Sequence, residues 1–169
     1  MAESAPSFRF LTSHPAHFVS LGFGSGLAPV APGTFGTLAG WVLFPLLYLP
    51  FSLLPFSEYV FTCLLVVFFV AGISLTDKTG KALGVPDHGA IVWDEMVAIW
   101  LVLAFTPHTL LWQAVAVVLF RIFDIAKPPP VRWADRNFKG GFGVMLDDLF
   151  AAIYALICLH ILLYLWTLL

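Results

Sequence analysis

The chain has 169 residues, of which 60% are hydrophobic and only 11% are charged, and its mean hydropathy is +0.95. Charged residues make up about a quarter of an ordinary soluble domain, so this composition argues against one and indicates an integral membrane protein. With eight Lys and Arg and a formal net charge of −2, the chain lacks the basic surface that nucleic-acid binding requires. The length suits one domain, which we expect to cover residues 1–169.

The N-terminal part is predicted to be irregular. Residues 1–19 mix aromatic, histidine and polar residues, which is typical either of a tail or of a segment lying on a membrane surface. Residues 20–37 are rich in glycine and proline, so no regular helix is expected there. Thr34 or Thr37 could cap the apolar helix that follows. Backbone N–H groups at a helix start can bind an anion, which makes Thr34 a candidate phosphate-binding residue; a structural loop is the alternative.

Five apolar runs follow. Those at 38–56, 59–75 and 149–169 are each close to the roughly 20 residues that cross a bilayer as a helix. Those at 91–105 and 110–123 are shorter, and we expect them to form a helical hairpin that is tilted or reaches only part-way. We therefore predict an all-α integral membrane bundle with about four to five membrane-embedded helices.

The basic residues test this topology independently. If each run crosses the membrane once, all eight Lys and Arg residues fall on the side of the N-terminus. Loops that carry Lys and Arg mark the cytoplasmic side of a membrane. The same side receives the Gly-rich loop, Asp94, Glu95 and the polar stretch 121–148. We therefore predict a polar site that faces the cytoplasm.

Two pairs of adjacent carboxylates, Asp94-Glu95 and Asp147-Asp148, lie at the predicted starts of apolar runs, and Asp124 adds a fifth acid. One explanation is capping, because acids at a helix start favour the helix dipole. A cap, however, uses one carboxylate, and each of these starts has two. Carboxylates brought together repel one another unless a cation or a proton relieves them. Mg²⁺ suits oxygen-only ligands and binds carboxylates together with waters and phosphate oxygens.

The stretch 121–148 also carries five basic residues and three glycines. Arginine pairs its N–H groups with phosphate oxygens, and lysine supplies a point charge. Glycines let the backbone approach a phosphate closely. Carboxylates, basic residues and a glycine turn are together typical of phosphoryl-transfer sites, although we expect at least two of the basic residues to be ordinary membrane-surface anchors.

Three segments carry motifs in this order: GFGSGLAPVAPGTFG at 22–36, DHGAIVWDE at 87–95, and FRIFDIAKP at 120–128 continued by DRNFKGGFGVMLDD at 135–148. On these residues the chain resembles the phosphatidylglycerophosphatase A family of bacteria. The resemblance implies an all-helical, Mg²⁺-dependent membrane phosphatase of the bacterial inner membrane. Such an enzyme would hydrolyse phosphatidylglycerophosphate to phosphatidylglycerol and phosphate in phospholipid biosynthesis.

With that activity, our hypothesis is that a bound Mg²⁺ polarises the phosphate and that a carboxylate positions or deprotonates water. The candidate metal ligands and catalytic acids are Asp94, Glu95, Asp147 and Asp148, with Asp124 as a further ligand or a neighbour of the ligands. The candidate phosphate-binding residues are Arg121, Lys127, Arg136, Lys139 and Thr34. Two alternatives are a phospholipid-headgroup transferase, whose Asp-Gly-x2-Ala-Arg motif is not found here, and a non-catalytic membrane transporter or scaffold.

Overall fold

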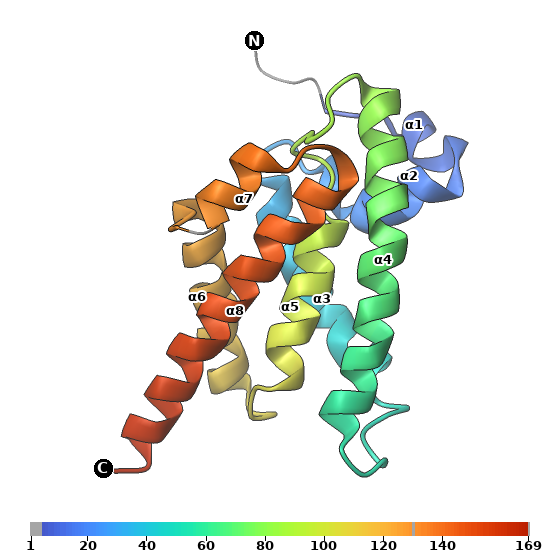
Figure 1. Ribbon diagram of the computed structural model, residues 1–169. Helices are drawn as coiled ribbons and strands as arrows, with labels where there is room; N and C mark the ends of the chain where they lie inside the picture. Colours follow the sequence, from blue (N-terminus) through green and yellow to red (C-terminus); the bar gives the residue numbers. More distant parts are fainter. Residues whose placement is uncertain (1–4, 130, 169) are drawn as a thin grey trace.

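The computed structural model describes residues 5–129 and 131–168, without the side chains of residues 134–136. Within these residues all regular structure is helical, with eight α-helices and one 3-10 helix (Figure 1), so the all-α prediction is confirmed. Two helices, α4 (Ser57–Leu83) and α8 (Gly140–Trp166), are long and apolar enough to cross a membrane. Only 22% of the most apolar stretch of each is buried, which distinguishes them from core helices of a soluble protein.

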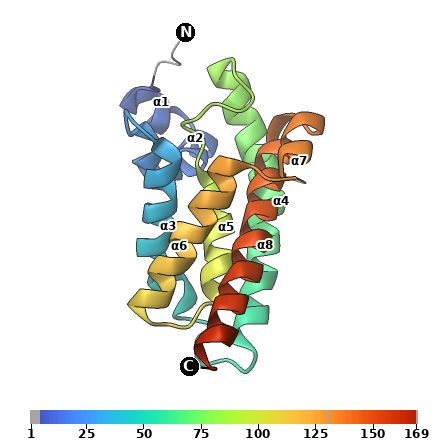
Figure 2. The same cartoon turned by 90° about the vertical axis from the view of Figure 1, so that its left-hand side faces the viewer.

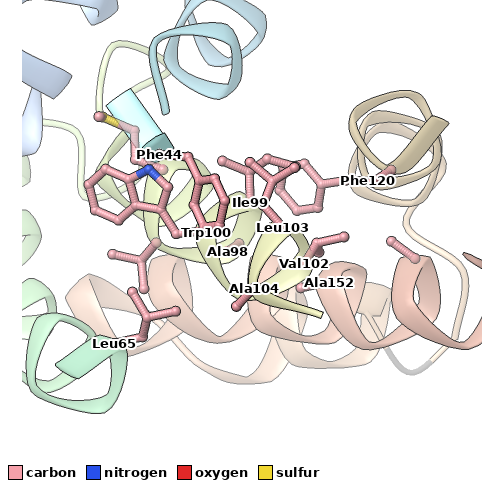
Figure 3. Packing of buried hydrophobic residues seen from close by; sticks show 14 of the residues in the cluster. Phe44, Leu65, Ala98, Ile99, Trp100, Val102, Leu103, Ala104, Phe120 and Ala152 are labelled. Carbon is pink, nitrogen blue, oxygen red and sulfur yellow. The ribbon is translucent and has the colours of Figure 1, made fainter. Parts of the chain in front are cut away.

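The short helix α5 (Trp93–Ala104) forms the centre of the bundle. Ten of its 12 residues are buried, and a helix that is apolar all round belongs in a core. Helices α3 (Pro32–Tyr48), α4, α6 (Leu110–Ala126) and α8 pack around it. Figure 3 shows this packing, in which Phe44 of α3 and Phe120 of α6 approach one side of α5. The core thus fixes the position of α5 and of the acids in its first turn.

The segment predicted as a tail or surface segment contains two short helices, α1 (Phe8–Ser13) and α2 (Pro15–Ser20). Each is capped by a side chain, because Ser7 accepts a hydrogen bond from the N–H of Phe10 and His14 accepts one from the N–H of Ala16. Helix α2 packs against α4, so this segment is part of the fold.

The prediction of no regular helix over residues 20–37 holds for residues 21–31, within which Phe23 and Gly24 are non-helical, and was wrong from Pro32 onward. The 3-10 helix η1 (Gly22–Leu27) is followed by α3, which begins at Pro32. Ala31 adopts a left-handed conformation (φ 49°, ψ 52°) that redirects the chain, and a proline suits the first position of a helix. Thr34 and Thr37 therefore lie inside α3 and do not cap it; the Thr37 hydroxyl donates to the Gly33 carbonyl at 2.9 Å.

Both long helices extend further into the polar segments than expected. Helix α4 continues to Leu83, where Gly84 in the left-handed conformation (φ 76°) ends it. Helix α8 begins at Gly140, so Asp147 and Asp148 lie in its third turn and not at a helix start. Capping therefore does not explain this acid pair. A further helix, α7 (Val131–Asn137), occupies part of the predicted loop.

The polar segments gather at one end of the bundle. Figures 1 and 2 show α1, α2, α7, the start of α8 and the connection from α4 to α5 at that end. The α3–α4 and α5–α6 connections and the C-terminal end of α8 lie at the opposite end. The Lys and Arg residues occur in the first group of segments or in the adjoining turns of α4 and α6. This is the arrangement predicted from hydropathy and charge.

Candidate metal and phosphate site

Three carboxylates meet where the first turn of α5 packs against the third turn of α8. They belong to Asp94, Glu95 and Asp148, and one oxygen atom of each lies within 4.8 Å of those of the other two. Asp94 and Asp148 are only 8% and 4% exposed. We call these three residues the acid cluster. The packing of α5 on α8 brings together acids that are more than fifty positions apart in the sequence.

The chemistry of the acid cluster fits a hard divalent cation. Each member has one buried oxygen for which no hydrogen-bond partner occurs among the described residues: Asp94 Oδ1, Glu95 Oε2 and Asp148 Oδ2. A buried polar atom without a partner costs about 1–3 kcal/mol, and a charged one costs more. Mutual repulsion adds to this cost. A cation with oxygen ligands, such as Mg²⁺, would offset the charge of all three carboxylates and bind one oxygen of each. The cluster could therefore hold a metal ion.

Arg121, on α6, lies beside the acid cluster. Its Nη1 atom is 2.5 Å from Asp124 Oδ2, one turn along the same helix, and 3.9 Å from Glu95 Oε1. Nη1 also donates to Thr37 Oγ1 at 3.4 Å. Arg121 Nε is buried and has no partner in the described part of the chain. Asp124 thus fixes the orientation of the guanidinium and lies outside the acid cluster, while Arg121 keeps an N–H group that could bind an anion.

The structure separates the second pair of acids. Asp147 Oδ2 lies 2.6 Å from the ammonium nitrogen of Lys127, whereas Asp148 belongs to the acid cluster. Lys127 follows α6 in a left-handed conformation (φ 42°, ψ 61°), which is uncommon for any residue other than glycine. Three of the four predicted metal ligands therefore lie together, and the fourth, Asp147, contacts a predicted phosphate-binding residue instead.

The remaining predicted phosphate-binding residues lie around this centre. Lys139 is exposed at the position that precedes α8. It lines a small cavity of about 40 Å³ together with Asp87 and Asp147. Thr34 is half-buried in the first turn of α3, where its N–H donates to the Ala31 carbonyl at 2.9 Å. The side chain of Arg136 lies outside the described residues.

Sequence reasoning missed the close approach of α3 to the acid cluster. A Cβ atom added to Gly33 would lie only 2.2 Å from Glu95 Oε1 and 3.4 Å from Arg121 Nη1. Gly36 and Gly40 are similarly close to Val92 and Ile99. Glycines at 33, 36 and 40 share one helix face, and small residues at such spacing let helices pack closely. The spacing of these three glycines was the feature of the sequence that could have predicted the close packing of α3 on α5.

The fold and the site together define an all-helical, largely apolar protein with a candidate metal site bordered by basic side chains, which suits an enzyme that acts on a phosphate group. The sequence model described as phosphatidylglycerophosphatase A matches residues 18–163. The chain belongs to the phosphatidylglycerophosphatase A family. The resemblance drawn from the motifs is thereby confirmed, and so is the enzyme class.

Curated relatives agree with the family. A phosphatidylglycerophosphatase A from Haemophilus influenzae is 46% identical over 160 residues, which cover 93% of this chain and 94% of the relative. A phosphatidylglycerophosphatase A from Escherichia coli is 43% identical and covers 86% of this chain and 81% of the relative. A relative from Bacteroides thetaiotaomicron, provisionally named a phosphatidylinositol-3-phosphatase, is 42% identical. The match covers 85% of this chain and 90% of the relative. No solved structure was found to match the chain.

Proposed function

We propose that this chain is a Mg²⁺-dependent lipid phosphatase that hydrolyses phosphatidylglycerophosphate to phosphatidylglycerol and inorganic phosphate. The family and the names of the relatives from Haemophilus influenzae and Escherichia coli support the substrate. One observation carries the assignment of the site: the acid cluster has three buried oxygens without partners among the described residues, directly beside Arg121.

In this proposal the acid cluster holds the metal ion. When bound, Mg²⁺ supplies Lewis-acid chemistry that polarises the phosphate and offsets the charge of the three carboxylates. Asp147 does not share the ion directly; it holds Lys127 next to the cluster through the 2.6 Å ion pair. Asp124 acts as a positioning residue, because it fixes the guanidinium of Arg121.

The basic residues bind the substrate phosphate. Arg121 donates its N–H groups to phosphate oxygens, and Lys127, which directly follows α6, adds a positive charge. Lys139, Arg136 and the first turn of α3 at Thr34 form the outer rim. Water attacks phosphorus as a carboxylate of the acid cluster accepts its proton, and the bond from phosphorus to the glycerol oxygen breaks. The glycerol oxygen takes up a proton and leaves as the hydroxyl of phosphatidylglycerol.

We further propose that residues 1–169 form one domain in the bacterial inner membrane, with α3, α4, α5, α6 and α8 embedded. Large apolar side chains are exposed on the outer faces of the bundle, among them Val42, Val67, Val118 and Ile157. A bilayer would cover them. The end of the bundle that carries the basic residues would face the cytoplasm. The phosphate site therefore lies at the level of lipid headgroups.

Phosphate release from detergent-solubilised protein tests the proposal. Release from phosphatidylglycerophosphate is expected with Mg²⁺ and should be lost with EDTA. No release in the presence of Mg²⁺ would overturn the phosphatase proposal and favour a transporter or scaffold. A lipid product joined to an added alcohol would instead identify a headgroup transferase. Phosphatidylinositol 3-phosphate belongs in the same assay, because one relative is provisionally named for that substrate.

A further inference from the structure

An apolar cavity of about 190 Å³ begins at the acid cluster and lies between α4, α5 and α8. Asp94 lines this cavity and is the one charged residue among the described residues of its lining. Pockets for whole drug-sized ligands measure roughly 300–1,000 Å³, so this cavity is suited to part of a molecule. Its position connects the candidate phosphate site with the apolar middle of the bundle.

Helix periodicity gives the cavity one continuous apolar wall. On α5 the lining residues are Asp94, Val97, Ala98 and Leu101, which follow the i, i+3, i+4, i+7 spacing of a single helix face. The lining residues of α4, between Thr62 and Phe69, have the same spacing. From Asp94 to Leu101 the wall rises about 10 Å along the helix axis. The cavity is therefore elongated, with its polar end at the acid cluster.

The polar end is closed by tight helix packing, and the apolar end opens sideways. Near the acid cluster α4 and α8 touch closely, because a Cβ atom on Gly141 would lie 1.9 Å from the Ile73 carbonyl and one on Gly72 would lie 2.7 Å from Met145 Sδ. Farther from that end the two helices diverge (Figure 1). Val66, which lines the cavity between them, is 57% exposed. The cavity is therefore accessible from the outer surface of the bundle.

We propose that this cavity binds the upper part of one acyl chain of the lipid substrate and so positions the phosphate over the acid cluster. The proposal rests on the proposed function. The wall presents hydrocarbon, since the one hydroxyl on its α4 face, that of Thr62, donates to the Glu58 carbonyl at 2.7 Å. An apolar wall that ends at a candidate phosphate site matches a molecule that joins a hydrocarbon chain to an anionic headgroup.

A matched pair of valines tests the proposal. Val66→Trp would fill the cavity from its open side, whereas Val118→Trp makes the same change on α6, which does not border the cavity. The two valines are 57% and 56% exposed, so both should accept tryptophan without loss of folding. The assay compares phosphatidylglycerophosphate with two oleoyl chains against the same lipid with two acetyl groups, which are too short to fill the cavity.

We expect Val66→Trp to raise KM for the dioleoyl substrate about tenfold, which corresponds to excluding roughly two methylene groups from an apolar site. The KM for the diacetyl substrate, and both values for Val118→Trp, should stay near those of the wild type. A similar change of Val66→Trp on both substrates, or no change on either, would overturn the proposal.

A second measurement does not depend on turnover. Phosphatidylglycerol with a diazirine on its acyl chain is photolysed with the wild-type protein, and the labelled peptides are identified by mass spectrometry. Labels on residues 62–69, 97–101 or 145–149 would support the proposal, and Val66→Trp should reduce them. Labels confined to other segments would overturn it. If the wild type hydrolyses neither lipid, the proposed function fails, and this labelling still decides whether the cavity holds a chain.

Discussion

The ammonium nitrogen of Lys127 lies 2.6 Å from Asp147 Oδ2 and so connects the end of α6 with the third turn of α8. Asp147 precedes Asp148, a member of the acid cluster, so this ion pair borders the candidate metal site. The Lys127 side chain is 30% exposed and that of Asp147 is 9% exposed. Lys127 therefore neutralises a largely buried carboxylate while part of its side chain stays exposed.

Replacing Lys127 should separate these two roles. Lys127→Met removes the ammonium partner of Asp147, and we expect a loss of about 1–3 kcal/mol in the free energy of unfolding. Phosphatase kcat/KM should fall at least about tenfold, because a charge that binds the phosphate is lost. The double variant Lys127→Met, Asp147→Asn should recover stability but not activity. Denaturation and phosphate release measure the two effects, and recovery of both in the double variant would contradict a phosphate-binding role.

Hydropathy predicted the number and order of the main helices but not their ends. It detects the apolar part of a helix, whereas α4 continues through Asp77, Lys78 and Lys81 to Leu83. Polar residues at the end of a long helix can be solvated and still complete its backbone hydrogen bonds. The glycine at 84 was a usable stop signal. The apolar run at 149–169 did not indicate that α8 already begins at Gly140.

The sequence identified the acids of the site but not their grouping. Successive side chains on a helix point about 100° apart, so adjacent acids need not share an ion. On α8 this places Asp148 in the acid cluster and Asp147 against Lys127. Which acid faces α5 depends on the rotation of α8 about its axis, and tertiary packing determines that rotation. The contact between Gly33 and Glu95 depends on the same packing.

Gly33→Ala should lower activity with little loss of stability. Alanine is intrinsically better than glycine in a helix by about 1 kcal/mol, but its Cβ atom would lie 2.2 Å from Glu95 Oε1. The Glu95 carboxylate must then shift away from the acid cluster. We expect kcat to fall at least about tenfold, since a displacement of about 1 Å in a catalytic site can have a larger effect. Unchanged kcat at wild-type melting temperature would show that Glu95 need not keep its position.

Asp148→Asn should make the protein more stable without metal and insensitive to added Mg²⁺. The substitution keeps the shape of the side chain but removes one of three mutually repelling charges. In EDTA we therefore expect a higher melting temperature than in the wild type. Mg²⁺ should raise the melting temperature of the wild type, because it binds the folded state. The variant should show neither this rise nor phosphatase activity.

Two other substitutions serve as controls for the Mg²⁺ experiment. Asp77→Asn changes a partly exposed acid on α4 that pairs with Lys81 at 2.6 Å and is not a member of the acid cluster. It should keep the Mg²⁺-dependent rise in melting temperature. Asp147→Asn should keep this rise too, because Asp147 contacts Lys127 and is not in the acid cluster. If Asp147→Asn abolishes the rise while Asp148→Asn preserves it, the assignment of the two acids must be exchanged.

Acid should loosen the contact between the N-terminal helices and α4. His17 is buried, its Nδ1 lies 3.0 Å from Thr79 Oγ1, and its ring stacks on Phe10. Burial, together with the nearby charges of His14 and Lys78, lowers the pKa of His17 below its ordinary value of 6.5. The folded state therefore binds this proton less readily than the unfolded chain. Neutral His17 therefore contributes to the free energy of unfolding at a pH above its pKa in the unfolded chain. This contribution is lost as the pH falls through the lower pKa that His17 has in the folded protein.

Melting temperatures at about pH 7.5 and about pH 5.5 test this prediction. The wild type should melt at a lower temperature at the acidic pH, and His17→Gln should show a smaller decrease, because glutamine can bond to Thr79 without taking up a proton. His160→Gln is the control, since His160 is exposed near the C-terminal end of α8. It should keep the full decrease seen in the wild type. Equal decreases in the two variants would mean that other groups cause the acid sensitivity and that the His17 contact does not.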